Sequence, residues 1–250
     1  MRLAPRRKAA ATSPPLLQAH ALGHAFGRQC ALDGVSLRMD SGDTLCVIGP
    51  NGSGKTTLFN TLSGQLQPQR GQVLFRGMAL RGRRPDQIAR LGLGRKFQVP
   101  SVFGTLSSLD NLLLARRAAG LPARPADVDT LLRDTGLAGR AQVPAAELSH
   151  GERQWLEIAM VTSQAPRLLL LDEPTAGMTQ AETLATVALI RKLCQRDGIA
   201  CIVVEHDMQF VAALESKVMV LADGRVIAQG AFDTVRQSAA VRQAYLGHDA

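Results

Sequence analysis

Short apolar runs, separated by polar and glycine-rich stretches, dominate the first third of the chain and predict strands. Residues 16–48 alternate partly between apolar and polar positions, most clearly from 32 to 39, as half-buried strands do. Residues 45–48 form a continuous apolar run of strand length. Residues 73–80 have the composition of a hairpin. The N-terminal region is therefore expected to be rich in β-structure.

The middle of the chain has the spacing of helices. Residues 55–64 predict a helix that ends at a glycine. From about residue 85 to residue 144, apolar residues recur at i, i+3 and i+4, and strand-like runs are scarce. We therefore expect a helical sub-domain at about residues 85–150, inserted into the rest of the fold.

Strands and helices alternate in the last third of the chain. Apolar runs predict strands at residues 168–172, 199–204 and 218–221, and the segments between them predict helices at residues 179–196 and 207–214. This alternation predicts a parallel sheet with helices on its faces. The expected fold class is α/β, with a single domain over residues 16–250.

The composition fits a folded protein that does not cross a membrane by itself. The chain has 250 residues, of which 46% are hydrophobic, so it can bury a substantial core. No apolar run approaches the roughly 20 residues that a transmembrane helix needs. Residues 1–15 are basic and lack the apolar centre of a secretory signal, which predicts a disordered tail. The four cysteines form no C-x-x-C pair and are expected to be buried thiols in a reducing cytoplasm.

The formal net charge of +8 leaves two kinds of partner open. Basic residues attract nucleic acids, and they attract the headgroups of anionic lipids equally well. The aromatic fraction is only 4%, which leaves few side chains on which single-stranded bases could stack. We expect no nucleic-acid partner.

A phosphate-binding loop follows the apolar run at residues 45–48. Residues 49–56 match G-x-x-x-x-G-K-[ST] between a predicted strand and a predicted helix; the alternative is a glycine-rich turn that only caps a helix. Glycines let backbone N–H groups turn toward an anion, and the helix start adds its positive end. Lys55 would reach the β- and γ-phosphates of a nucleoside triphosphate, and the Thr56 hydroxyl would bind Mg²⁺. The expected nucleotide contacts are Gly49, Pro50, Asn51, Gly52, Ser53, Gly54, Lys55, Thr56 and Thr57.

Two carboxylates end the apolar strand predicted at residues 168–172. Such a strand delivers Asp172 to the carboxyl edge of a sheet, where it can hold Mg²⁺ beside a bound phosphate. Glu173 is the candidate for orienting and polarising the attacking water in phosphoryl transfer. The alternative is an acidic loop after a core strand, which is common in isolation.

Three further segments, taken with the phosphate loop and the acidic strand, carry a family resemblance. In order and spacing they resemble the signature, switch-histidine and Q-loop segments of ATP-binding cassette ATPases, over nearly the whole chain from about residue 16. The resemblance implies a P-loop NTPase core with a mainly parallel sheet, an N-terminal antiparallel β region and an inserted helical sub-domain. The three segments are residues 148–154, 204–207 and 97–98.

More narrowly, the chain resembles the cassettes of branched-chain amino acid and amide importers, and among these the ATP-binding subunits of urea importers. His150 stands where the family signature usually has Gly, which is similar to urea-type cassettes. Glu152 stands where the signature usually has Gln, a departure that leaves room for a divergent relative. The segments that carry this resemblance are residues 92–98, 148–158, 176–179, 205–208 and 245–247.

The resemblance implies that the signature binds ATP held by a second protomer. The residues concerned are Ser149, His150, Gly151 and Glu152. Ser149 and Glu152 also match an S-x-x-E capping box, and the two roles are compatible because a capped helix start still offers N–H groups to an anion.

Further site residues are also implied by the resemblance. His206 would hydrogen-bond to the γ-phosphate, with a simple helix-start residue as the alternative. Gln98 would contact Mg²⁺ and water. Phe26 would stack on adenine, with a core or edge-strand aromatic as the alternative. Residues 176–179 lack the Asp of a D-loop and fit another capping box, so they receive no catalytic role.

The expected function is ATP binding and hydrolysis, with ATP and Mg²⁺ as cofactors, to power an importer of a small polar solute. The resemblance favours urea or a related amide; a branched-chain amino acid importer is the alternative, and a cassette of lipopolysaccharide export or a soluble cassette is the second. Expected partners are a second ATPase subunit, identical or different, integral membrane permeases and, indirectly, a periplasmic solute-binding protein. The chain would lie peripherally at the cytoplasmic face of the inner membrane. A cassette of DNA repair or translation fits less well, because neither coiled-coil arms nor a second cassette is present.

Overall fold

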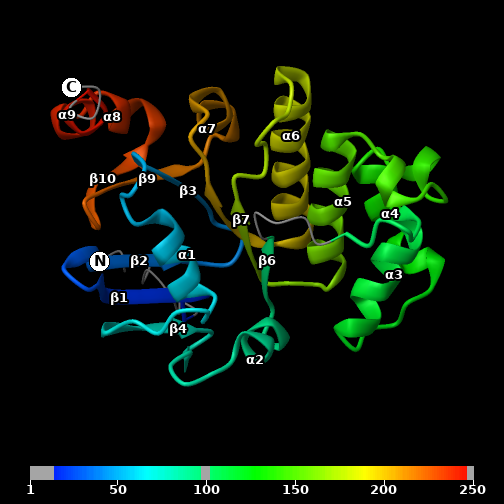
Figure 1. The fold of residues 1–250 in the computed structure, drawn as a ribbon, viewed down its shortest axis with the longest axis horizontal. Helices are drawn as coiled ribbons and strands as arrows, with labels where there is room; N and C mark the ends of the chain where they lie inside the picture. The colour runs from blue at the N-terminus through cyan, green and yellow to red at the C-terminus, as the bar shows by residue number, and fades with distance from the viewer. Residues whose placement is uncertain (1–13, 97–101, 247–250) are drawn as a thin grey trace, which may run out of the picture.

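The computed structural model describes residues 14–96 and 102–246, and two β-sheets organise them (Figure 1). Nearly all of the predicted tail at residues 1–15, and Gln98, lie outside the described residues. The first sheet is antiparallel and covers the N-terminal region. Its strands, in spatial order, are β2 (Gln29–Met39), β1 (Leu17–Phe26), β4 (Arg70–Phe75) and β5 (Met78–Ala79).

The second sheet is mainly parallel, and an antiparallel strand forms one edge. Every residue of β7 and β8 is buried, as expected for parallel strands that are covered on both faces. The α/β fold class is therefore confirmed, together with its antiparallel N-terminal region. In spatial order the strands are β10 (Arg225–Ala231), β9 (Lys217–Ala222), β3 (Thr44–Ile48), β8 (Ala200–Val204), β7 (Leu168–Asp172) and β6 (Leu93–Lys96).

Helices pack on both faces of the second sheet. One face shares a core with the antiparallel sheet and α1 (Lys55–Leu62), whose Leu58 and Phe59 are fully buried. The opposite face packs against α6 (Gln180–Asp197) and α7 (Met208–Leu214). Alternate residues of the central strands thus belong to two different cores. The C-terminal part adds α8 (Phe232–Arg236) and α9 (Ala239–Leu246), which the sequence analysis did not predict.

A helical unit lies at one end of the molecule, shown in green in Figure 1. It has an apolar core of its own, which contains Leu112, Val128 and Leu156. Its elements are α3 (Ser108–Ala118), α4 (Pro125–Asp134), η1 (Ala138–Arg140), η2 (Ala145–Glu147) and α5 (His150–Ser163).

The helical pattern predicted from residue 85 is wrong for residues 93–96, which form strand β6 beside β7. This strand is short and contains a glycine and two cations, so it has no apolar strand signature. Helix α2 (Pro85–Arg90) precedes it, and its buried Ile88 packs in the core shared by the two sheets. Residues 85–96 thus pack with the sheets, and the limits 85–150 of the sub-domain remain a prediction.

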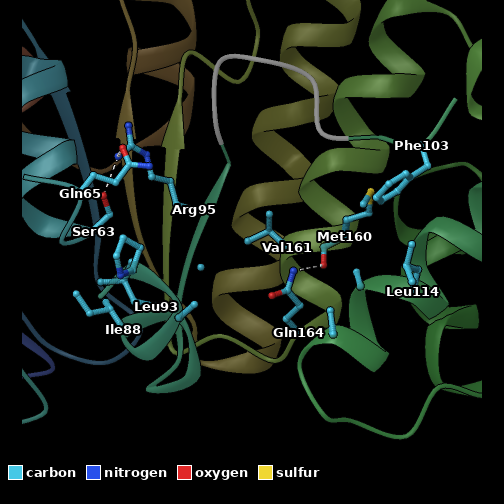
Figure 2. Close-up of a pocket in the computed structure, with 15 residues that line it drawn as sticks. Ser63, Gln65, Ile88, Leu93, Arg95, Phe103, Leu114, Met160, Val161 and Gln164 are labelled. Atoms are coloured by element: carbon cyan, nitrogen blue, oxygen red, sulfur yellow. Dashed lines mark hydrogen bonds between the residues drawn. The ribbon is translucent and has the colours of Figure 1, made fainter. Parts of the chain in front are cut away.

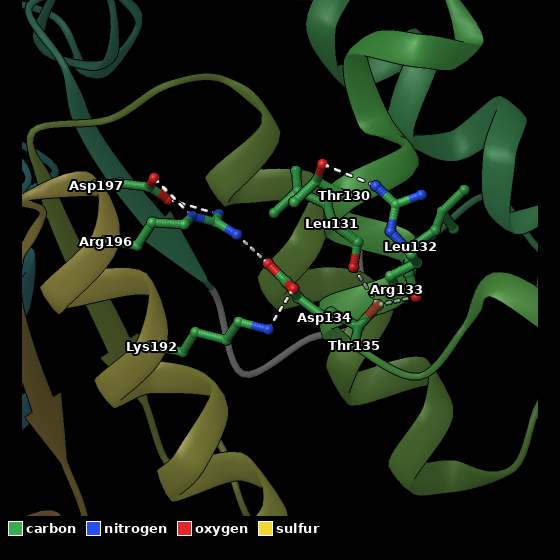
Figure 3. A network of polar contacts seen from close by, with 9 residues as sticks. All are labelled: Thr130, Leu131, Leu132, Arg133, Asp134, Thr135, Lys192, Arg196 and Asp197. Atoms are coloured by element: carbon green, nitrogen blue, oxygen red, sulfur yellow. Dashed lines mark hydrogen bonds and ion pairs between the residues drawn. The ribbon is translucent and has the colours of Figure 1, made fainter.

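A network of ion pairs joins the helical unit to α6 (Figure 3). Asp134, at the end of α4, is paired with Arg196 and lies 2.6 Å from Lys192 Nζ. Burial acts to raise the pKa of Asp134, but the hydrogen bonds from the two cations outweigh it and hold this pKa below its ordinary value. The network fixes α4 against α6.

Within residues 14–96 and 102–246, no helix combines the length and the apolar character needed to cross a membrane.

Candidate active site

The phosphate loop connects β3 to α1, and its backbone has room only for glycine at two positions. A Cβ on Gly49 would lie 2.1 Å from the carbonyl oxygen of Leu221. Gly54, at the start of α1, has a φ of 103°, and a Cβ there would lie 2.3 Å from the carbonyl oxygen of Ala31. The loop therefore needs glycine at these positions for two reasons: any side chain would collide with a neighbouring carbonyl oxygen, and the backbone adopts a conformation that glycine tolerates best.

The ammonium group of Lys55 lies over the loop. Its Nζ donates hydrogen bonds to the carbonyl oxygens of Gly49, at 2.7 Å, and Pro50, at 2.9 Å. Burial lowers the pKa of Lys55, while the carboxylates of Glu173 and Asp172 act to raise it. A compact cation is thus held between the loop and the end of β7, where it can pair with phosphate oxygens.

A cleft of about 350 Å³ opens beside the loop. Its size is within the usual range for small-molecule sites. Phe26, at the end of β1, lies on its wall and is 54% exposed, so this ring is not a core aromatic. The cleft is lined by Phe26, Gln29, Ala31, residues 51–57 and Glu173.

Asp172 ends β7 and is buried. Burial raises the pKa of its carboxyl group, whereas the guanidinium of Arg95, 3.6 Å away, acts to lower it. The Thr56 hydroxyl and the Asp172 carboxylate supply oxygen atoms, the donors that Mg²⁺ prefers. No group of three or more His, Cys, Asp or Glu in the described chain could hold a metal ion. This donor set fits Mg²⁺, which takes one or two protein ligands and completes its shell with phosphate and water.

Glu173 has a backbone conformation that is rare for a residue with a side chain, with a φ of 45°. Its N–H donates to the carbonyl oxygen of Val204 at 2.9 Å, and its carbonyl accepts from Ala176 N at 3.3 Å. Such a conformation costs about 1–3 kcal/mol and persists where neighbours impose it, typically at functional sites. The strained turn aims the Glu173 side chain at the cleft, which it lines.

His206 follows β8 and faces Glu173. Its Nδ1 lies 3.8 Å from Glu173 Oε1, and its side chain is 68% exposed. The first turn of α7 is capped by Asp207, whose carboxylate accepts from Gln209 N at 2.8 Å and from Phe210 N at 3.4 Å. Since Asp207 caps this helix, the position of His206 is not explained by helix capping.

Glu205 is a site residue that the sequence analysis named only as part of a motif. It is 1% exposed. Its Oε1 accepts from the Thr175 backbone N–H at 3.1 Å and hydroxyl at 2.6 Å, and its Oε2 accepts from His206 N at 3.2 Å. Glu205 therefore fixes the turn after β7 relative to the turn after β8. A carboxylate at the end of a fully apolar strand was the available signal.

The signature residues lie at the start of α5 and do not line the cleft. The capping box is present: Ser149 N donates to Glu152 Oε2 at 2.8 Å, and Glu152 N donates to Ser149 Oγ at 3.2 Å. His150 Nε2 lies 2.8 Å from the carbonyl oxygen of Ala176, and Gly151 packs against Glu182. Thr179 and Glu182 form the second predicted capping box, at the start of α6.

The structure thus brings together the phosphate loop, Phe26, Asp172, Glu173 and His206, whereas the signature residues do not line this cleft. Gln98 lies outside the described residues.

Comparison with known proteins gives matches over nearly the whole chain. The family model described as ABC transporter matches residues 32–176, and the model described as branched-chain amino acid ATP-binding cassette transporter matches residues 225–250. The high-affinity branched-chain amino acid transport ATP-binding protein BraF of Pseudomonas aeruginosa is 34% identical over 94% of this chain and 99% of its own. The lipopolysaccharide export system ATP-binding protein LptB of Acidithiobacillus ferridurans is 34% identical over 93% and 97%.

A solved structure has the same fold over the same extent. It is the ADP conformation of an ATP-binding cassette of an ABC transporter, with a TM-score of 0.85 and 27% identity over 94% of this chain and 99% of the other.

Proposed function

Because this chain belongs to the ABC transporter family of ATPases, we propose that it is the ATP-hydrolysing subunit of an importer of branched-chain amino acids. The observation that carries the solute class is the match of residues 225–250 to the C-terminal model of branched-chain amino acid cassettes. The similarity to BraF over the full length supports the same class. Urea was the first expectation from the sequence, and the comparisons support the branched-chain amino acid alternative better.

A urea or amide importer is the second candidate, and one observation favours it. His150 stands at a signature position where the family usually has Gly, which is similar to urea-type cassettes. Its imidazole contacts the carbonyl oxygen of Ala176 in the same chain. The solute itself does not touch an ATP-binding subunit in this proposal, so transport must be measured to separate the two.

The proposed chemistry follows from the positions of the side chains around the cleft. Lys55 and the loop N–H groups bind the phosphates, and Phe26 stacks on the base. Glu173 orients and polarises the attacking water, and His206 contacts the γ-phosphate. Thr56 and Asp172 would hold Mg²⁺, which supplies neutralising charge at the phosphates. The single observation that supports hydrolysis is the strained turn at Glu173, which sets its carboxylate 3.8 Å from His206.

A complete site requires a second cassette. The N-terminus of the 14-residue helix α5 has a positive dipole that suits an anion, but its signature residues do not line the cleft of the same chain. We therefore propose head-to-tail pairing, in which Ser149, His150, Gly151 and Glu152 contact ATP bound by the partner. ATP binding closes the pair, and hydrolysis reopens it.

An apolar groove between the sheets and the helical unit is the proposed contact for a membrane permease (Figure 2). It encloses about 490 Å³. Ile88 and Leu93 line one side, and Leu114 and Met160 line the other. Phe103, which is 53% exposed, also lines it. An apolar segment of a permease at the inner membrane would touch both units at once, and a periplasmic solute-binding protein would act through that permease.

The test is uptake of labelled leucine and, in parallel, labelled urea by cells that lack this protein, with wild-type or Glu173→Gln copies restored. Leucine uptake that recovers only with the wild-type copy is the expected result. Recovery of urea uptake alone would replace the first candidate with the second. No change in either would refute both solutes and direct attention to lipopolysaccharide export.

A further inference from the structure

Arg95 occupies an unusual position between the candidate magnesium carboxylate and the apolar groove. It lies near the end of β6, and its side chain is 7% exposed. Nη2 faces Asp172, with 3.6 Å to Oδ2. Nη1 donates to three neutral oxygens: Asn60 Oδ1 at 2.9 Å, Ser63 Oγ at 2.7 Å and Gln65 Oε1 at 3.1 Å. One guanidinium thus contacts a carboxylate on one side and an uncharged cradle on the other.

The cradle forms part of the groove wall. Ser63, Gln65 and Arg95 all line the groove, and Figure 2 shows them together at one end of it. The guanidinium also lies 5.8 Å from the centre of the Phe59 ring, a favourable cation–π distance. Arg95 is therefore held by several groups that do not take part in phosphate binding.

A buried cation beside a metal carboxylate has an electrostatic consequence. Taking a guanidinium out of water costs several kcal/mol unless its partners compensate, and a carboxylate is the partner that compensates best. Mg²⁺ at Asp172 would need the same carboxylate and would be repelled by the nearby positive charge. Arg95 and Mg²⁺ would thus compete for the Asp172 carboxylate.

We propose that Arg95 is a positioning residue that serves as the counter-ion of Asp172 and competes with Mg²⁺ for it, so that Arg95 sets how strongly Mg²⁺ promotes ATP binding. This inference rests on the proposed function, because it takes Asp172 as the magnesium carboxylate. The cradle keeps the guanidinium 3.6 Å from Asp172. A molecule that binds in the groove and forms hydrogen bonds with Ser63 or Gln65 therefore alters the competition between Arg95 and Mg²⁺ for Asp172.

The neighbouring residue offers a matched control. The side chain of Lys96 is 2% exposed and forms an ion pair with Glu157 of α5, with 3.1 Å between Nζ and Oε2. Successive residues of a strand point to opposite faces. Lys96→Gln therefore breaks a buried ion pair of the same strand, and it removes a charge that acts on the pKa of Asp172 more weakly than Arg95 does.

The experiment measures the ATP affinity of the Glu173→Gln protein by calorimetry, once with EDTA and once with saturating Mg²⁺. The quantity of interest is the dissociation constant with EDTA divided by the dissociation constant with Mg²⁺, which measures how strongly Mg²⁺ promotes ATP binding. Arg95→Met should increase this ratio by about five- to tenfold, the size expected for removing one charge a few ångströms from the metal. Arg95→Lys, which keeps the charge, should return the ratio to within about twofold of the parent. Gln65→Met, which removes one acceptor of the cradle, should decrease the ratio.

Each outcome bears on one claim. A variant that only damages the fold weakens ATP binding equally with EDTA and with Mg²⁺ and leaves the ratio unchanged. Lys96→Gln should increase the ratio less than Arg95→Met does, because the charge of Lys96 acts on Asp172 more weakly. An unchanged or decreased ratio for Arg95→Met overturns the competition, and an unchanged ratio for Gln65→Met overturns the link to the groove. If the parent protein binds no ATP in either condition, the proposed function fails instead.

Discussion

Replacement of Glu205 by Gln should damage both stability and catalysis, although this residue contacts no nucleotide in our proposal. The carboxylate is 1% exposed and accepts from the Thr175 N–H, the Thr175 hydroxyl and the His206 N–H. A hydrogen bond to a charged group contributes about 1.5–3 kcal/mol. Glutamine keeps one acceptor oxygen, but in place of the other oxygen it has an amide NH₂ group, which faces a hydrogen-bond donor and cannot accept from it.

We therefore expect Glu205→Gln to lower the free energy of unfolding by about 2–4 kcal/mol, the sum of one lost bond and one unsatisfied donor, reduced by the easier burial of a neutral amide. The turn that carries Glu173 and the turn that carries His206 would lose their shared anchor. Misplacement of reacting groups by about 1 Å can cost about a hundredfold in rate. The ATPase kcat should fall by a factor of about ten to one hundred.

The measurements are urea unfolding and ATPase kinetics. Glu215→Gln is the matched control, because Glu215 is 68% exposed and its carboxylate pairs only at the surface, 2.8 Å from Arg191. Surface pairs of this kind contribute about 0–1 kcal/mol. If Glu205→Gln and Glu215→Gln unfold at the same urea concentration and hydrolyse ATP equally fast, the anchoring role of Glu205 is refuted.

Three further predictions concern the loop, the dimer and the helical unit. Gly54→Ala should abolish ATP binding measured by calorimetry, because its Cβ would lie 2.3 Å from a backbone oxygen; retained affinity would contradict the fit of this loop. Glu173→Gln with ATP should elute from a sizing column as a dimer and Lys55→Ala as a monomer, and identical elution would count against head-to-tail pairing. Asp134→Asn should lower stability by about 1 kcal/mol near pH 7, since its cationic partners are half-exposed. Because the pKa of Asp134 is lowered in the folded state, its contribution is present above the ordinary Asp pKa and is lost as pH falls below it; a difference between variant and parent that stays constant down to pH 3 would refute this.

Local patterns were sufficient for the parts of the site that lie next to each other in sequence. The apolar run of β3, the glycines and Lys55 predicted a strand, a loop and a helix, and the structure has all three. The runs that became β7 and β8 were recognisable because strands buried on both faces are apolar throughout. By contrast, most residues of β10 are partly or fully exposed, so this edge strand had no such signal and was missed.

The groups that were missed owe their positions to partners far away along the chain. Strand β6 reads as polar, yet Arg95 and Lys96 are buried because Asp172 and Glu157 lie opposite them. A pattern of burial inferred from hydrophobicity assigns such cations to the surface. Burial of a charge requires a partner, and the partner can be a functional carboxylate, as Asp172 is in our proposal. Buried cations on a short polar strand beside a fully apolar one can therefore indicate a functional carboxylate nearby. Arg95 on β6 is such a cation: it contacts Asp172 at the end of β7, and it also lines the groove that we propose for docking.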